Sequence, residues 1–232
     1  MRVLVVQNFE NAELGQVGDV LAEAGAEIDI RKAHLGDPLP GDANGHDALV
    51  VLGGGQNALA DEEFPYIPTI LDLMRDFEAK DRAVLGICLG SQLLARAFGG
   101  ENLIGTSPEF GWRQISRTDA AADDAVLGVL PQTFLAFQVH DDTFTLPEGA
   151  VHLCANAVTR NQAFRIGRAA YGFQFHFEAN LPLVRRWNEA FPELILRHRP
   201  DWFESFDDEA ATYSRQADEA GLALARAWVA TI

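Results

Sequence analysis

A short stretch near the middle of the chain, Gly86-Ile87-Cys88-Leu89-Gly90, constrains the fold most. It ends the apolar run 83–87, which predicts a buried strand, and precedes residues 91–98, which predict a helix. A strand, a sharp turn that carries a nucleophile and a helix together form a nucleophile elbow, here with cysteine in place of serine. Glycine two positions before and two after the nucleophile avoids a collision with the neighbouring backbone. The same residues are also compatible with a buried packing cysteine beside structural glycines.

The first hundred residues predict an open, mostly parallel sheet. Apolar runs at 2–7, 47–52 and 83–87 and an alternating run at 26–31 predict four strands. Helical spacing of apolar residues at 11–24 and 65–80 predicts helices between them. Strands that alternate with helices are typical of a doubly wound α/β fold, in which helices cover both faces of the sheet.

The pattern changes after Gly100. Five runs typical of strands follow without a long helix between them, at 112–117, 134–140, 150–155, 164–168 and 170–175. They predict an antiparallel extension on one side of the sheet. Helices return at 183–190, 194–198 and 208–230, and the acidic residues 207–209 predict the start of the last one. No linker interrupts the chain, so we expect a single domain over residues 1–232.

Charge and cysteine content narrow the classes of function. A net charge of −16 argues against nucleic-acid binding. No run approaches the ~20 apolar residues that span a bilayer, and the apolar start is too short for a signal peptide. Cys88 and Cys154, the two cysteines, share no C-x-x-C spacing, so neither a zinc site nor a disulfide framework is expected. We therefore expect no metal, no cofactor, no membrane or nucleic-acid partner, and a cytoplasmic location.

A thiol nucleophile needs a base, and the base needs a group that holds its tautomer. Among the six histidines, His176 comes at the end of an apolar strand and is followed two residues later by a carboxylate, Glu178. In an extended chain such residues point the same way, so Glu178 can hold one imidazole nitrogen while the other faces the thiol. Strand ends of an open parallel sheet meet at the edge where the elbow lies. The sequence therefore predicts a catalytic triad of Cys88, His176 and Glu178.

Attack on a carbonyl creates an oxyanion that needs fixed N–H donors. The N–H of Leu89, directly after the nucleophile, supplies one by the geometry of the elbow. The run 53–55, three glycines at the end of a neighbouring strand, can supply another because glycines permit a nest of N–H groups. Three glycines could also be only a flexible turn.

These motifs carry a resemblance to a known family. The sequences G-I-C-L-G-S-Q, the preceding G-G-G and the late Y-G-F-Q-F-H-F-E resemble the class I glutamine amidotransferases over residues 45–180. Residues 109–112 and 137–144 are similar to stand-alone bacterial members described as GMP-synthase-like. The resemblance implies a flavodoxin-like fold and a Cys-His-Glu triad that cleaves the side-chain amide of glutamine through a γ-glutamyl thioester. It also implies oxyanion donors, Gly54 and Leu89, and a substrate site that includes Gly53, Gly55, Gln92, Gln138, Val139 and His140.

Two positions depart from that family pattern. Such relatives usually carry tryptophan before the histidine at position 140 and glycine after it, where this chain has Val139 and Asp141. This difference bears on the fit of the substrate. Phe177 stands in place of the usual proline between the triad histidine and glutamate, which leaves the triad chemistry unchanged.

The resemblance predicts a glutaminase that supplies ammonia to a synthase. The sequence shows neither a P-loop nor a Ser-Gly-Gly pyrophosphatase loop, so we expect the acceptor site on a separate synthase polypeptide. A γ-glutamyl peptidase or hydrolase with the same triad is the alternative. A non-catalytic regulatory role beside a synthase is a third possibility, which the intact triad disfavours. Other hydrolases and chaperones with this elbow place histidine directly after the cysteine, where this chain has Leu89.

Overall fold

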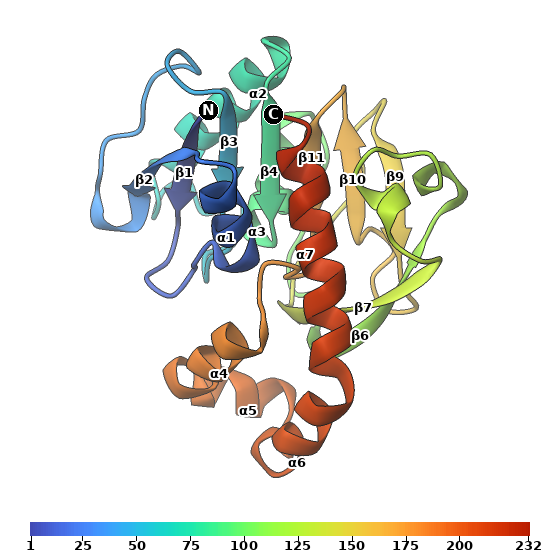
Figure 1. Cartoon of the computed structure of the whole chain (residues 1–232). Coiled ribbons are helices and arrows are strands. Elements are labelled where there is room, and N and C mark those ends of the chain that lie inside the picture. Colours follow the sequence, from blue (N-terminus) through green and yellow to red (C-terminus); the bar gives the residue numbers. More distant parts are fainter.

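A nine-stranded sheet organises the computed structural model, which describes all residues from Met1 to Ile232 (Figure 1). Its strand order is β2-β1-β3-β4-β11-β10-β9-β6-β7. The strands are β1 (Arg2–Gln7), β2 (Glu27–Lys32), β3 (Ala48–Val51), β4 (Ala83–Ile87), β6 (Glu109–Arg117), β7 (Thr133–His140), β9 (Val151–Ala155), β10 (Ala163–Ile166) and β11 (Ala170–Phe173). A separate two-stranded sheet pairs β5 (Asn102–Leu103) with β8 (Thr143–Phe144).

The pairing directions divide the large sheet into two parts. Strands β2, β1, β3, β4 and β11 are parallel neighbours. Strands β10, β9, β6 and β7 add an antiparallel extension beyond β11. This arrangement confirms the predicted α/β fold with its antiparallel extension.

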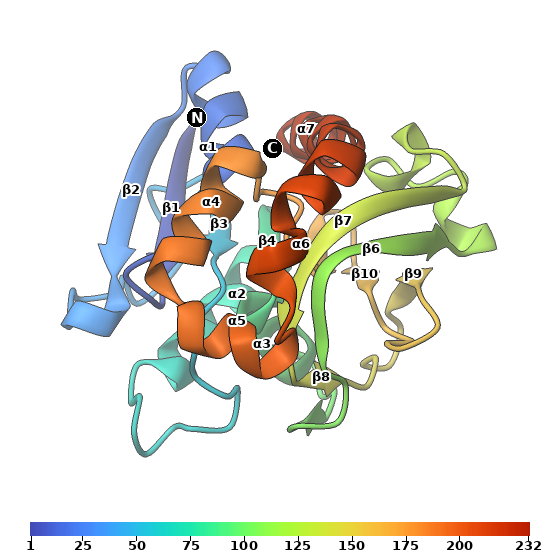
Figure 2. The same cartoon turned by 90° about the horizontal axis from the view of Figure 1, so that it is seen from below.

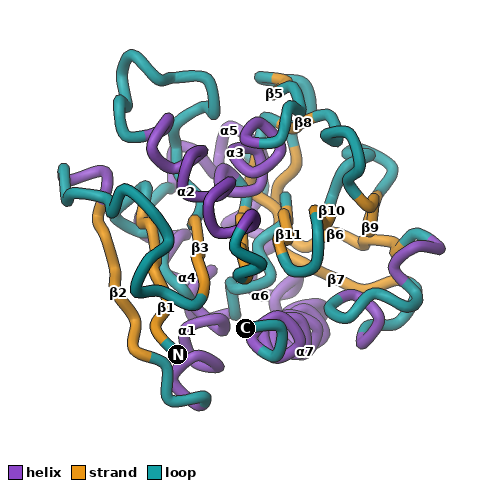
Figure 3. The backbone as a smooth tube through the Cα atoms, turned by 90° about the horizontal axis from the view of Figure 1, so that it is seen from above, coloured by secondary structure: helices purple, strands orange, loops and turns teal.

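Helices cover both faces of the parallel part of the sheet and the carboxyl ends of its strands. Figure 3 shows α1 (Gly15–Glu23) and α7 (Arg215–Val229) on one face, with α2 (Ile67–Ala79) and α3 (Leu89–Ala97) on the other. Helices α4 (Leu181–Ala190), α5 (Pro192–His198) and α6 (Trp202–Glu209) lie across the carboxyl ends of the parallel strands (Figure 2). Single turns of 3₁₀ helix occur at Ala33–Leu35, Asp119–Ala121 and Leu127–Val129. None of the helices combines the length and apolar character needed to cross a membrane.

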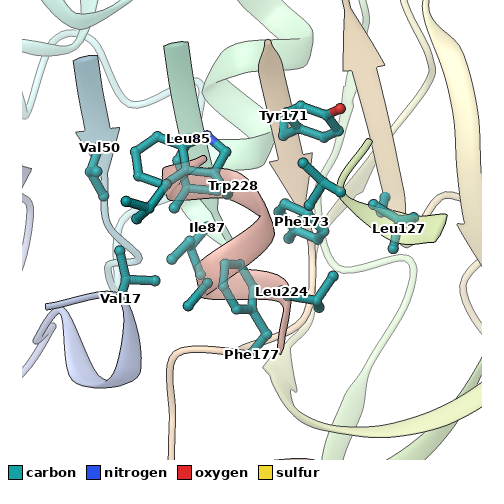
Figure 4. Close-up of a cluster of buried hydrophobic side chains, with 14 of the residues drawn as sticks. Val17, Val50, Leu85, Ile87, Leu127, Tyr171, Phe173, Phe177, Leu224 and Trp228 are labelled. Atoms are coloured by element: carbon teal, nitrogen blue, oxygen red, sulfur yellow. The ribbon is translucent and has the colours of Figure 1, made fainter. Parts of the chain in front are cut away.

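The core has a layer on each face of the sheet because side chains alternate along every strand. In β1, Val3 and Val5 belong to the layer under α1 and α7, whereas Leu4 and Val6 belong to the layer under α2 and α3. Figure 4 shows the first of these layers, in which α7 contributes Trp228. A third, aromatic cluster joins α4–α6 to β6 and β7, and this cluster anchors the helices beside the strand ends.

The predicted start of the last long helix is wrong. The acidic residues 207–209 lie at the end of α6, which begins at Trp202 and continues through a π-helical stretch, Ala210–Ser214, into α7. Trp202 is fully buried, and its ring lies 5.7 Å from that of Trp112 on β6. Burial of Trp202 and Phe206 extends the helix toward the N-terminus, which outweighs the weaker preference of acidic side chains for a helix start.

Candidate active site

Cys88 occupies the turn between β4 and α3 in a strained backbone conformation. Its φ of +51° is one of two positive values among the residues other than glycine. A Cβ on Gly86 would overlap the backbone of Gly90, and a Cβ on Gly90 would overlap the backbone of Val51. The Cys88 N–H donates to the Phe173 carbonyl over 2.8 Å, which ties the turn to β11. The structure thus confirms the sharp turn between strand and helix at Cys88 and the steric need for both glycines, whereas the role of Cys88 as nucleophile stays a prediction.

His176 and Glu178 follow β11 and are held by their backbones on both sides. The His176 N–H donates to the Phe137 carbonyl over 2.8 Å, and the Glu178 carbonyl accepts from the Gln16 N–H over 2.9 Å. The side chains meet as expected for residues two apart in extended chain, with His176 Nδ1 2.7 Å from Glu178 Oε1. Both side chains are buried. Glu178 therefore fixes the imidazole and leaves Nε2 for a second partner.

The imidazole and the thiol face the same pocket. Cys88, His176 and Glu178 all line a cavity of about 170 Å³. A Cβ placed on Gly53 would lie 3.5 Å from Cys88 Cβ and 3.3 Å from His176 Cε1, so a single methyl group would touch both residues. His176 Nε2 is buried and has no hydrogen-bond partner. The structure therefore brings the three predicted catalytic residues together around one cavity.

The charge state of His176 follows from its neighbours. Burial alone lowers its pKa, but the carboxylate of Glu178 and, next, the sulfur of Cys88 outweigh burial and raise the pKa from 6.5 to about 10. The imidazole therefore carries a proton at neutral pH, and this proton is available for a leaving group.

The raised pKa of His176 predicts a pH dependence of stability. A group whose pKa is higher in the folded state stabilises the fold fully below its unfolded pKa of 6.5, and this contribution disappears as the pH rises through about 10. Between these limits, the unfolding free energy of the wild type should fall by roughly 1 kcal/mol per pH unit relative to His176→Gln. Urea unfolding at pH 6.5, 8 and 9.5 measures this slope. His34→Gln, at a histidine bonded to the Gln7 carbonyl, is the control and should keep the wild-type slope.

The predicted oxyanion donors lie beside the thiol. Gly53, Gly54 and Gly55 line the pocket, and none of their N–H groups donates a hydrogen bond within the protein. Leu89 is the first residue of α3, so its N–H has no partner within the helix. A Cβ on Gly54 would lie 2.9 Å from the Leu89 side chain, so the two segments are in direct contact. The role of Gly54 and Leu89 as oxyanion donors stays a prediction.

The other predicted substrate residues divide between the pocket and a buried polar region. Val139 lines the pocket, and its carbonyl oxygen lies 3.8 Å from Cys88 Sγ. Gln92, Gln138 and His140 are buried but do not line the pocket. Gln138 Nε2 donates to Gln162 over 2.9 Å, and His140 Nε2 lies 3.4 Å from a carboxylate oxygen of Glu109.

A chain of amides links this polar region to the sulfur. Gln92 Nε2 donates to Gln174 Oε1 over 3.3 Å, and Gln174 Nε2 lies 3.9 Å from Cys88 Sγ. Cys88 thus lies near a buried amide and also lines the pocket. Contact of Gln92, Gln138 and His140 with a substrate stays a prediction.

Trp187 is the clearest site residue that the motifs do not indicate. Its ring stands edge-on to the imidazole of His176 at a centroid distance of 5.0 Å, and its Nε1 donates to the Asn11 carbonyl over 3.1 Å. Phe191, Leu194 and Ile195 continue the same wall of the pocket. Their spacing from Trp187 predicts an apolar helical face but not the surface that it covers.

Comparisons with known proteins agree with this geometry. The sequence profile of the glutamine amidotransferase class-I family matches residues 12–183. A glutamine amidotransferase-like protein of Salmonella typhimurium is 30% identical over 79% of this chain and 78% of its own length. A subunit of the glutamine-hydrolysing GMP synthase of Methanosarcina barkeri is 27% identical over 78% of this chain and 88% of its own length. The crystal structure of a glutamine amidotransferase from Thermotoga maritima matches with a TM-score of 0.83 and 27% identity, over 99% of this chain and 96% of that one. With three quarters of its length matched by the family profile, this chain belongs to the class-I glutamine amidotransferases.

Proposed function

We propose that the protein hydrolyses the side-chain amide of glutamine with Cys88 as nucleophile, His176 as acid and base, and Glu178 as the group that holds the imidazole. The observation that carries the proposal is the meeting of these residues at one cavity, with the cysteine on a strained elbow. The 2.7 Å contact between His176 Nδ1 and Glu178 supports the assigned roles. Membership of the amidotransferase family supports glutamine as the substrate.

The reaction would proceed in two halves. The sulfur of Cys88 attacks the amide carbon, and the oxyanion accepts hydrogen bonds from the N–H groups of Gly54 and Leu89. The C–N bond then breaks as His176 gives its proton to the nitrogen, so that ammonia leaves and a γ-glutamyl thioester remains. In the second half His176 takes a proton from water, and the hydroxide attacks the thioester. The C–S bond then breaks, which releases glutamate and regenerates the Cys88 thiol.

The released ammonia would pass to an acceptor site on a separate synthase polypeptide. Relatives named as subunits of a glutamine-hydrolysing GMP synthase support this part of the proposal. A γ-glutamyl hydrolase is the second candidate function, and the apolar wall that faces His176 favours it, because ammonia alone would not use such a surface.

Three measurements test the proposal. With glutamine alone, the protein should release ammonia and glutamate in equal amounts, and hydroxylamine should divert the thioester to γ-glutamyl hydroxamate. Mass spectrometry of the acid-quenched reaction should place a γ-glutamyl group on the peptide that contains Cys88. Addition of a candidate synthase with its acceptor substrate should raise the rate if the chain is an amidotransferase. Glutamine turnover without any adduct on Cys88 would contradict the proposed mechanism.

A further inference from the structure

The pocket beside His176 has a composition that glutamine does not explain. Aromatic and aliphatic side chains form most of its walls, among them Phe110, Phe137, Trp187 and Phe191. No lysine or arginine lines it. The charge of its most exposed acid, Glu13, is already paired with Arg186 at 2.9 Å. The pocket is therefore suited to an uncharged, apolar group.

The amino-acid end of a glutamyl substrate does not fit this pocket. Its α-carboxylate would find no lysine or arginine among the lining residues and would share the pocket with the carboxylate of Glu178, which is unfavourable. Amides that do not line this pocket offer polar groups instead, since Gln174 Nε2 lies 3.9 Å from Cys88 Sγ and the Oε1 of Gln138 is buried without a partner. We therefore place the glutamyl group beside these amides.

The leaving group then lies on the side of the apolar pocket. His176 lines this pocket, and the acid that protonates a leaving nitrogen must lie within hydrogen-bond reach of it. A substituent on that nitrogen would extend past His176 toward Trp187, whose ring is 5.0 Å from the imidazole.

The far wall of the pocket lies outside the part of the chain that the family profile matches. The profile ends at residue 183, whereas α4 and α5 contribute Trp187, Phe191, Leu194 and Ile195. Figure 2 shows these helices across the carboxyl ends of the strands, and Phe191 packs on Phe9 with a centroid distance of 5.6 Å. The apolar wall therefore comes from residues beyond the profile match, although the Thermotoga structure matches 99% of this chain.

We infer that the preferred substrates are γ-glutamyl amides of apolar amines, with an aromatic or aliphatic substituent of the nitrogen held against α4 and α5. The inference rests on the proposed thioester chemistry and names its substrate class. Cys88 forms the thioester as the C–N bond breaks, His176 donates the proton with which the amine leaves, and water then releases glutamate. The amide nitrogen of glutamine carries no substituent, so glutamine would leave the apolar pocket empty.

The test compares three substrates of the same protein: glutamine, the γ-phenethylamide of glutamate and its γ-(2-hydroxyethyl)amide. Glutamate release should give the phenethylamide a kcat/KM about 10 to 100 times that of glutamine, with the hydroxyethylamide well below the phenethylamide. Hydrolysis of glutamine at an equal or higher kcat/KM than the phenethylamide would overturn the inference and leave the proposed function intact. Hydrolysis of none of the three would overturn both.

Two leucines of α5 provide matched variants. Leu194 lines the pocket, whereas Leu196 is 43% exposed and does not. Leu194→Asp should lower the ratio of kcat/KM for the phenethylamide to that for glutamine at least tenfold, while Leu196→Asp keeps the wild-type ratio. The ratio does not depend on the fraction of folded protein, so a loss of stability does not imitate the effect. An unchanged ratio in Leu194→Asp would place the substituent elsewhere and overturn the inference.

Discussion

Cys88→Ser is expected to lower kcat for glutamine hydrolysis about 10⁴-fold or more, with the fold intact. Serine preserves the size of the side chain and the backbone of the elbow, but its hydroxyl is a far weaker nucleophile than a thiol at neutral pH. Glu178, which remains in the variant, raises the pKa of the His176 imidazole, so a protonated His176 is a poor base for the serine hydroxyl. Ammonia release from glutamine by the purified variant, under single-turnover and steady-state conditions, measures the loss.

The second cysteine provides the control for this substitution. Cys154 on β9 is fully buried, and burial raises the pKa of its thiol, so it is not a nucleophile at neutral pH. Cys154→Ala should retain kcat within a few-fold of the wild type. Ammonia release at the wild-type rate by Cys88→Ser would exclude Cys88 as the nucleophile, and with it the proposed scheme.

The elements of the sheet could be predicted because their patterns are local. The apolar runs that became β1, β3 and β4 are buried on both faces, and such strands appear in the sequence as continuous hydrophobic stretches. The start of α6 could not be predicted in this way. It depends on the burial of Trp202 against Trp112, two residues 90 positions apart in the sequence, and local charge patterns do not contain that contact.

The same distinction holds for the candidate site. Cys88 sits on a turn with a strict glycine requirement, and His176 and Glu178 are two residues apart, so each half of the predicted triad is local in sequence. A general rule of parallel sheets, that strand ends share an edge, is enough to join the halves. No such rule predicts that Trp187 lies beside His176, because an apolar helical face does not indicate the surface against which it packs.

Trp228→Ala is expected to destabilise the protein by about 3–5 kcal/mol, at the upper end of what a single core truncation costs. Trp228 is fully buried on α7, in the layer that also contains Leu85 and Phe177 (Figure 4). The backbone of α7 lies directly on the triad segment, because a Cβ on Gly221 would overlap the carbonyl of Phe177. Although α7 lies beyond the family-matched residues, we propose that residues 1–232 unfold as one unit. Urea unfolding followed by circular dichroism measures the change in free energy.

Trp228→Phe separates the packing of the ring from its polar group. The indole Nε1 of Trp228 is buried without a hydrogen-bond partner, so phenylalanine removes an unsatisfied donor while it keeps much of the apolar volume. We therefore expect a much smaller loss of stability than for alanine, and in both variants a single transition with fluorescence and circular dichroism in agreement. If α7 were only an appendage, Trp228→Ala would instead show an early transition of the helix followed by unfolding of the sheet at the wild-type midpoint. A single, earlier transition requires that the sheet, the triad segment and the C-terminal helix share one hydrophobic core.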